Sequence, residues 1–247
     1  MVRMDTIPLE MQSEESAIRF RDCFSVRYIQ SAALLCRLGY QIEKVPRDPE
    51  PSQEVLLRHE VFILNSVLST VAFLESTINE LFADAADDAY FFADEKTEVL
   101  LRTIREKWRN GKNFDRAPMI SKYQKILAIA GQPPFSEDEP AFSNVRELIG
   151  IRNHLMHYKR EWVVVRKTGS AGPGEETMSE KFAKHLGKKF ATNPFAAQNL
   201  PFFPDQCLGH GCAEWAIVNS IIFTDEFFRR LGLPVPYEGV KDELGTR

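Results

Sequence analysis

The longest helical pattern in this chain of 247 residues is residues 54–85, EVLLRHEVFILNSVLSTVAFLESTINELFADA. Its apolar side chains are distributed around most of the circumference of a helix, which is typical of a helix buried on most sides. The segment therefore predicts the central helix of the fold. The apolar positions include Val55, Leu57, Val61, Ile63, Leu64, Val67, Leu68, Val71, Phe73, Leu74, Ile78 and Leu81.

One narrow stripe of this segment is polar or small. Asn65, Ser69, Ala72, Ser76 and Asn79 follow one another at steps of four, three, four and three, so they share one face of a helix. Two interpretations are open. The stripe is either the exposed edge of a core helix or a polar seam turned towards a partner or a site.

Other helical patterns lie on both sides of the central segment. Residues 13–38 predict a helix capped by Ser13, and Gly39 is expected to end or bend it. Residues 40–45 fit either a strand or a second helical piece. Further helices are predicted at 95–109, 119–130, 179–190 and 212–231, and a fifth, capped by Ser143, carries residues 152–157.

Irregular segments separate these helices. Residues 162–165 predict a short strand or an extended tail, residues 167–176 a glycine-rich loop, and residues 193–204 an irregular stretch broken by prolines. Strands and helices do not alternate, so the pattern gives no indication of a parallel sheet. An all-α antiparallel helical bundle is the expected fold.

Composition narrows the class of protein. The chain is 44% hydrophobic and 27% charged, which is ordinary for a globular domain, and its net charge is -4. Residues 146–192 carry ten Lys/Arg against five Asp/Glu. This basic stretch indicates either a site for a polyanion or a solvated face.

The sequence shows none of the signals that are typical of secreted or membrane proteins. Four cysteines are too sparse for a disulfide framework, residues 1–15 have no apolar core of a signal peptide, and no run of about 18 apolar residues occurs. We therefore expect a cytoplasmic protein with no membrane span.

The chemical motif of the chain is Arg152-Asn153-His154-Leu155-Met156-His157. A histidine gives and takes protons near neutral pH, and an arginine binds a phosphate with two parallel hydrogen bonds. Together they have the groups needed to cleave a phosphodiester without a metal: one removes the 2′-hydroxyl proton, and the other stabilises the crowded phosphorane. On a regular helix Arg152 and His157 would lie about 140° apart, but the long arginine side chain can still reach the cleft that His157 faces.

This segment resembles the signature of the HEPN superfamily, which is an Arg, usually followed by Asn, Asp or His, and then a His after four to six intervening residues. Residues 73–81 resemble the first core helix of many bacterial HEPN-like proteins, and residues 122–127 resemble the helix that precedes the motif helix. The resemblance covers about residues 54–160 and the last helix. Tyr158 follows His157 directly, so the regulatory tyrosine that some toxin members have two places after the His is not present.

The resemblance implies a domain organisation. Residues 1–247 would form a single HEPN-like helical domain, an antiparallel bundle with a core at about 54–160 and 212–232. Residues 13–45 would be an additional N-terminal helical extension, and residues 167–205 a loop-rich insert before the last helix.

The resemblance also implies a function. Many members are metal-independent endoribonucleases of toxin–antitoxin or defence systems, which act as homodimers with two motifs facing one cleft. Arg152 and His157 would be the catalytic residues and Asn153 a positioning residue. RNA, a second copy and an antitoxin or other protein are the implied partners, and no cofactor is implied. Other members are non-catalytic interaction or RNA-binding modules, and that alternative stays open.

Further residues are candidates for supporting roles. Lys159, Arg160, Arg166 and Lys167 would guide RNA by electrostatic attraction, so activity would fall as salt rises. Supporting contacts to the motif are expected from Glu75, Asn79 and His154.

The sequence does not favour a metal site at Cys207, His210 and Cys212. A structural zinc needs a fourth ligand and usually a closer cysteine pair, and His185 would serve only if the fold brought it near. A turn at Gly209 and Gly211 that leads into a buried helix is the preferred interpretation. His59 and His185 have charged neighbours in the sequence and are expected to be solvated.

Overall fold

The computed structural model of the chain describes residues 22–46, 48, 50–86, 95–110, 116–159 and 176–247, and all regular structure in these residues is helical. The all-α prediction is confirmed for this part of the chain. The helices are α1 (Phe24–Lys44), α2 (Gln53–Ala86), α3 (Glu95–Asn110), α4 (Met119–Ile129), α5 (Pro140–Met156), α6 (Met178–Leu186) and α7 (His210–Leu231), with short turns of helix at Phe202–Gln206 and Glu238–Glu243.

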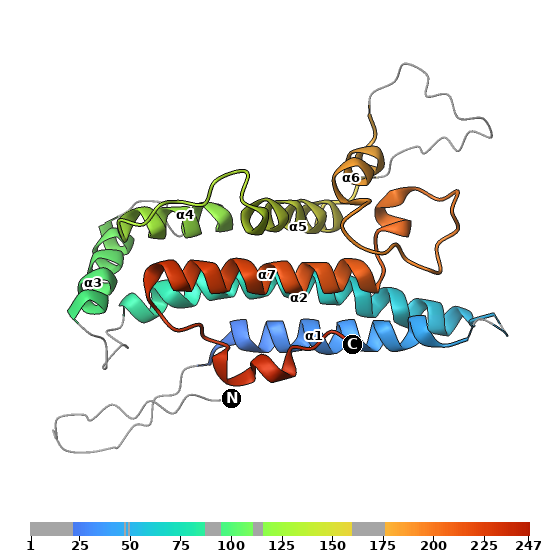
Figure 1. Cartoon of the computed structure of the whole chain (residues 1–247), viewed down its shortest axis with the longest axis horizontal. Coiled ribbons are helices and arrows are strands. Elements are labelled where there is room, and N and C mark those ends of the chain that lie inside the picture. Colours follow the sequence, from blue (N-terminus) through green and yellow to red (C-terminus); the bar gives the residue numbers. More distant parts are fainter. Residues whose placement is uncertain (1–21, 47, 49, 87–94, 111–115, 160–175) are drawn as a thin grey trace.

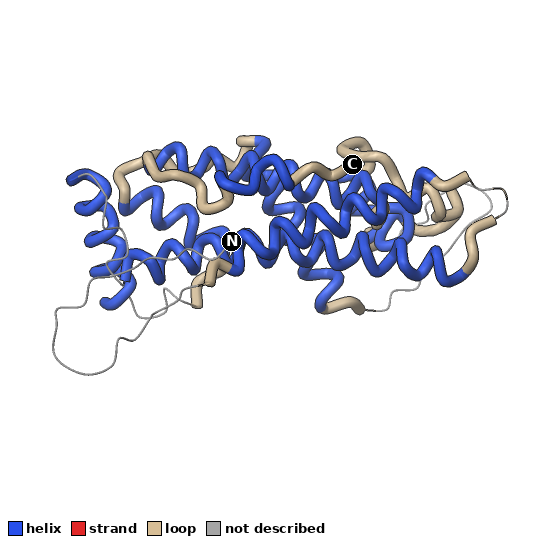
Figure 2. The backbone as a smooth tube through the Cα atoms, turned by 90° about the horizontal axis from the view of Figure 1, so that it is seen from below, coloured by secondary structure: helices blue, strands red, loops and turns tan. Residues whose placement is uncertain are grey.

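The helices form an elongated bundle (Figure 1). The long helices α1, α2 and α7 lie side by side along the long axis, and α1 runs in the opposite direction to the other two. Helices α4 and α5 follow one another along the same axis and cover α7 and α2. Figure 2 shows the same elongated arrangement from below, with helix as the only regular structure among the described residues.

The core is built around one face of α2. Ile63, Val67, Leu74 and Ile78 are fully buried. A cluster of aromatic rings continues the core between α2, α4 and α7, where the Tyr123 hydroxyl donates a 2.7 Å hydrogen bond to the carbonyl oxygen of Leu74. The rings of Phe223 and Phe227 lie 4.9 and 4.7 Å from the Tyr123 ring.

Helix α1 is an integral part of the bundle. It packs along α2 and also lies against α7. The Ser66 hydroxyl donates a 2.8 Å hydrogen bond to the carbonyl oxygen of Ala32 inside this seam. At its far end the Ser25 backbone N–H donates to Glu80 at 2.8 Å, and burial raises the pKa of the Glu80 carboxyl.

The expectation that Gly39 ends or bends the first helix is wrong. Helix α1 continues through Gly39 to Lys44, so residues 40–44 are helical. A Cβ atom at position 39 would lie 2.5 Å from Cδ1 of Ile63. The glycine is therefore needed where α1 approaches α2, and it does not break the helix. The predicted cap Ser13 lies outside the described residues.

Other predicted boundaries move by a few residues. Helix α5 begins at Pro140, after the extended residue Glu139, so Ser143 lies inside the helix and is not its cap. Helix α6 ends at Leu186, four residues before the predicted end. Helix α7 begins at His210 and ends at Leu231, and the next residue, Gly232, has a left-handed φ of 72°. The predicted strand at 162–165 lies outside the described residues.

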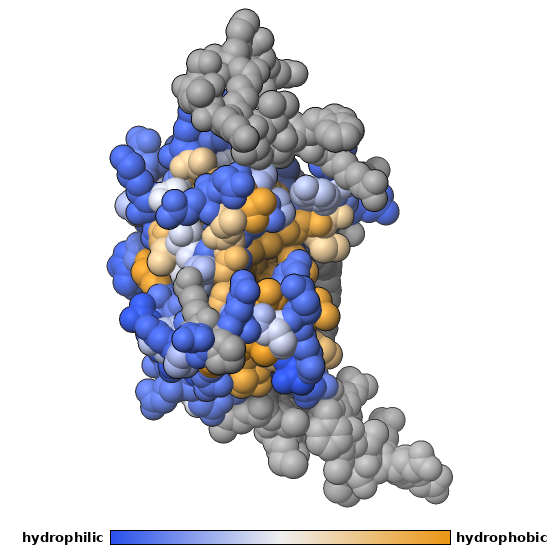
Figure 3. All heavy atoms as spheres, turned by 90° about the vertical axis from the view of Figure 1, so that its right-hand side faces the viewer, coloured by the Kyte–Doolittle hydropathy of each residue, from blue (hydrophilic) through white to orange (hydrophobic). Residues whose placement is uncertain are grey.

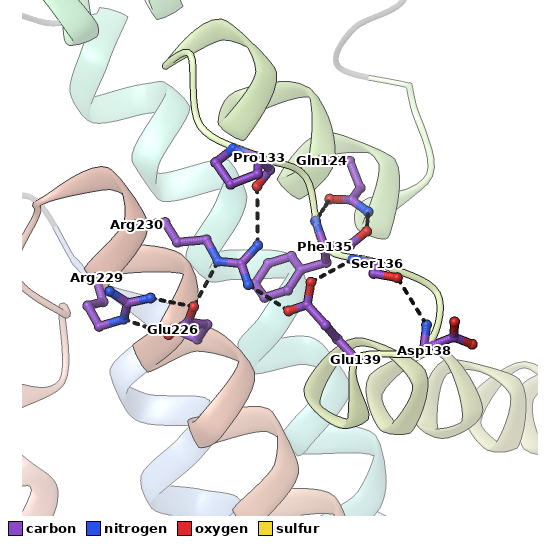
Figure 4. A network of polar contacts seen from close by, with 9 residues as sticks. All are labelled: Gln124, Pro133, Phe135, Ser136, Asp138, Glu139, Glu226, Arg229 and Arg230. Carbon is purple, nitrogen blue, oxygen red and sulfur yellow. Dashed lines mark hydrogen bonds and ion pairs between the residues drawn. The ribbon is translucent and has the colours of Figure 1, made fainter.

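The end of α7 is fastened to the connection between α4 and α5 (Figure 4). Arg230 donates hydrogen bonds to Glu226 at 2.8 Å, to Glu139 at 2.6 Å and to the carbonyl oxygen of Pro133 at 3.1 Å. Its guanidinium carbon lies 4.1 Å from the centre of the Phe135 ring. One side chain therefore joins α7 to the connection between α4 and α5, which lies 91 to 97 residues away in the sequence.

One helix among the described residues, α2, is long and apolar enough to cross a membrane by length and composition. The core helix of a soluble protein passes the same test when it is mostly buried, and half of the most apolar window of α2 is buried here. The apolar character of α2 is thus weak support for a membrane span.

Candidate functional site at the end of α5

Helix α5 carries the Arg–His segment at its carboxyl end. Phe142, Val145, Leu148 and Ile151 recur every three residues and are buried, which fixes the rotation of the helix against α7 and α2. Position 152 consequently falls at the edge of the buried face, next to α2.

The Arg152 side chain reaches α2. Its Nη2 lies 3.2 Å from Oε2 of Glu75, and its Nη1 donates a 3.1 Å hydrogen bond to Oδ1 of Asn153. The Arg152 side chain is 28% exposed and that of Glu75 is 47% exposed, so the pair lies at the surface. A guanidinium has five N–H donors, and these two contacts leave three for another acceptor.

His157 follows the last residue of the helix. Its backbone N–H still donates to the carbonyl oxygen of Asn153 at 2.9 Å, but its φ of -118° and ψ of 38° are not helical. The side chain is exposed, and the neighbouring side chains of Met156 and Tyr158 are exposed too. Because His157 has left the helix, the 140° separation expected on a regular helix does not apply.

Arg152 and His157 therefore both reach solvent near the same helix end. The described contacts include none that joins their side chains directly. An outside group would be needed to bridge the guanidinium and the imidazole.

His154 is held within the protein. Its Nδ1 lies 2.8 Å from the carbonyl oxygen of Gly150, and its ring packs edge-on against Phe182 of α6, with 5.1 Å between ring centres. These contacts turn it towards α6. It supports the packing of α6 on α5, and no described contact links it to His157.

Sequence reasoning missed one cationic residue near the site, Lys122 of α4. This side chain is buried, with the residue 4% exposed, and its Nζ donates a 2.8 Å hydrogen bond to Oδ1 of Asn79. Asn79 belongs to the polar stripe of α2 and lies one turn beyond Glu75, which is beside the stripe. Asn79 of the stripe contacts α4, and Glu75 beside the stripe contacts α5. These contacts agree with the polar-seam interpretation at this end of the stripe, whereas Asn65 at its other end is exposed and bonds only to Val61 of its own helix.

The predicted RNA-guiding residues are only partly described. Lys159 is exposed just after His157. Arg160, Arg166 and Lys167 lie outside the described residues. Lys159 is therefore a cation at the end of α5 that an anionic ligand could contact.

The end of the molecule towards which α5 runs carries apolar surface. Figure 3 views the end of the molecule at which α5 ends and α2 begins, and it shows hydrophobic side chains gathered in a hollow between hydrophilic flanks. Large exposed apolar side chains in the elements that reach this end include Val45, Leu57, Val61, Met156 and Leu200.

The cysteine pair forms a buried turn. Cys207 and Cys212 are both buried, with 3.9 Å between their sulfur atoms. The expectation that Gly211 belongs to a turn is wrong, because α7 begins at His210. A Cβ atom at Gly211 would lie 2.4 Å from the carbonyl oxygen of Ala191, so the start of α7 packs closely against another backbone segment. Among the described residues no group of three or more His, Cys, Asp or Glu side chains could hold a metal ion.

The expectation that His59 is solvated is wrong. The residue is 2% exposed, its Nε2 lies 2.8 Å from Oε1 of Glu43, and its ring packs edge-on against Phe195. His185, by contrast, has a side chain that is 70% exposed, as expected.

Comparisons of the chain with models of known protein families, with curated proteins and with solved structures give no match. The residues at the end of α5 and their geometry are therefore the basis for a proposed function.

Proposed function

We propose that this protein is a metal-independent endoribonuclease of the HEPN type that acts as a homodimer, in a toxin or defence role. The observation that carries the proposal is the arrangement at the end of α5. A guanidinium held by Glu75 keeps free donors at the surface, and an exposed imidazole stands five residues further on.

The proposed chemistry is an intramolecular transesterification, in which the phosphoryl group moves from the 5′-oxygen to the 2′-oxygen. His157 takes the proton of a 2′-hydroxyl, the 2′-oxygen attacks the adjacent phosphorus, and the 5′-oxygen leaves. Arg152 donates to the phosphate oxygens, whose negative charge increases in the phosphorane, and this stabilises the transition state.

A homodimer supplies the second imidazole that one chain lacks at this site. The leaving 5′-oxygen needs a proton, and a second imidazole can give it while the first takes one. His154 packs against Phe182 of α6, and no described contact links it to His157. The second imidazole is therefore assigned to His157 of a second copy, and the exposed apolar side chains at this end of the molecule support a protein contact there.

The second candidate is a non-catalytic HEPN-like interaction module. One observation favours it: Arg152 already has two partners, Glu75 and Asn153, and could serve only to brace α5 on α2. In that case His157 would be an ordinary exposed residue.

Cleavage of single-stranded RNA in the presence of a chelator separates the two candidates. The ribonuclease proposal expects cleavage by the wild type and a loss of at least about 100-fold in both His157→Ala and Arg152→Ala. His185→Ala is the matched control, because His185 is also an exposed histidine but lies on α6. Equal rates in all four proteins would exclude the catalytic role and favour the interaction module.

A further inference from the structure

The contact between Lys122 and Asn79 is unusual because it places an ammonium group in the interior beside a neutral partner. Lys122 is 4% exposed and donates to Oδ1 of Asn79, and the described residues contain no carboxylate within ion-pair distance of its Nζ. A buried charge without a counter-charge is costly. Features that break a packing rule are concentrated at functional sites.

This contact fixes the orientation of the Asn79 amide. An ammonium has only donors, so it must face the amide oxygen and not the amide nitrogen. The Nδ2 group of Asn79, which carries two N–H donors, is thereby directed away from Lys122. Because Asn79 itself is exposed, these donors are presented at the surface.

The exposed donors lie next to the proposed phosphate site. Asn79 and Glu75 are four residues apart on α2, which is about one helical turn of 5.4 Å. Glu75 holds the Arg152 guanidinium, so donors from Arg152 and Asn79 reach the same face of α2. Two sets of N–H donors at this separation can bind the phosphate backbone of an RNA strand.

We infer that Asn79 is a second RNA-contacting residue, whose Nδ2 donates to an oxygen of the phosphate next to the scissile one, and that Lys122 is a positioning residue which fixes the Asn79 amide. The inference rests on the proposed ribonuclease function and names a part of its substrate site. Lys122 does not touch the RNA; its charge acts through Asn79 and adds to the attraction for an anion.

The test measures binding separately from cleavage. In a His157→Ala background, the dissociation constant for a fluorescently labelled single-stranded RNA oligonucleotide is measured by anisotropy. Asn79→Ala weakens binding by about tenfold, since a hydrogen bond to a charged group is lost. Asn65→Ala is the matched control, because Asn65 is another exposed asparagine on the same stripe of α2 and bonds only to Val61 of its own helix.

Asn79→Asp separates an RNA contact from a structural role. The aspartate keeps the partner of Lys122 and turns the contact into an ion pair, so the melting temperature is unchanged or higher. It also replaces the outward donors with negative charge, so RNA binding weakens more than in Asn79→Ala. With His157 restored, the variants raise KM and leave kcat within about twofold of the wild type, since uniform binding is lost.

These measurements distinguish failure of the Asn79 inference from failure of the proposed function. If the wild type cleaves RNA and both Asn79 variants bind it as tightly as Asn65→Ala does, the inference is wrong and the proposed function stands. If the wild type neither binds nor cleaves single-stranded RNA, the proposed function fails and the inference fails with it.

Discussion

Arg152 and Glu75 are 77 residues apart in the chain, yet the guanidinium Nη2 lies 3.2 Å from the carboxylate Oε2. The pair joins α5 to α2 at the surface, directly before the helix end that carries His157. An exposed ion pair stabilises a fold by only about 0–1 kcal/mol, so the main effect of Glu75 is on the direction and the charge of the guanidinium.

Glu75→Gln is expected to strengthen RNA binding. The amide keeps an acceptor for Arg152 but removes a negative charge that repels a phosphate at the same place. We expect the dissociation constant for single-stranded RNA to fall by up to about fivefold, with a change in unfolding free energy below about 1 kcal/mol. Weaker binding by Glu75→Gln would contradict this account, and Glu75→Ala, which also loses the acceptor, serves as the comparison.

Arg230→Ala is expected to destabilise the fold by about 2–4 kcal/mol, because Glu139 and the Pro133 carbonyl lose their arginine partner and Glu226 keeps only Arg229. The Arg230 side chain is only 13% exposed, and it bonds to Glu226, Glu139 and Pro133. Its neighbour Arg229 is the matched control: that side chain is 71% exposed and pairs only with Glu226. Arg229→Ala should cost less than about 1 kcal/mol in urea unfolding. Equal losses would show that the contacts in Figure 4 are not the source of stability.

Low pH is expected to weaken the contacts between α7 and the α4–α5 connection, because Glu226 becomes protonated. Hydrogen bonds from Arg229 and then from Arg230 lower the pKa of Glu226 from 4.5 to about 2. Because the pKa is lower in the folded protein, the contribution of Glu226 to stability is fully present above pH 4.5 and is lost as the pH falls towards 2. The difference in unfolding free energy between the wild type and Glu226→Gln should therefore shrink across this window. A difference that is constant with pH would contradict the prediction.

Two helical glycines should respond in opposite ways to alanine. A Cβ at Gly39 would lie 2.5 Å from Ile63, whereas the nearest atom to a Cβ at Gly150 is 3.9 Å away. Gly150→Ala should stabilise the protein by up to about 1 kcal/mol, the gain in helix propensity. Gly39→Ala should destabilise it by about 1–3 kcal/mol through overpacking. Adding Ile63→Val removes Cδ1 and should recover part of that loss in thermal unfolding; no recovery would place the strain elsewhere.

Local sequence pattern predicted most of the helices. The 54–85 segment, the helix at 95–109 and the helix at 119–130 agree with α2, α3 and α4 within one residue at each end, because their apolar periodicity is a local signal. Gly39 misled the prediction because its role is set by Ile63, 24 positions away. Glycine is ambiguous from sequence when close packing and helix ending both favour it.

The site was only partly predictable for a similar reason. Glu75 was named from helix order, and its contact with Arg152 is present. His59 was expected to be solvated because Arg58 and Glu60 flank it, but neighbours in a helix point about 100° away, and Phe195 from a distant loop covers the ring. Lys122 gave no sequence signal, since a lysine in a helix is ordinarily a solvated residue.

The packing of α1 on α2 limits where the chain can be truncated. The resemblance places its core at residues 54–160 and the last helix, but α1 covers α2 at Ser66 and Ile63 and also lies against α7. A truncation that begins at Gln53 would leave that apolar flank uncovered and prone to aggregation. The smallest autonomous folding unit therefore includes the N-terminal helix, and expression of the motif-bearing part should retain it.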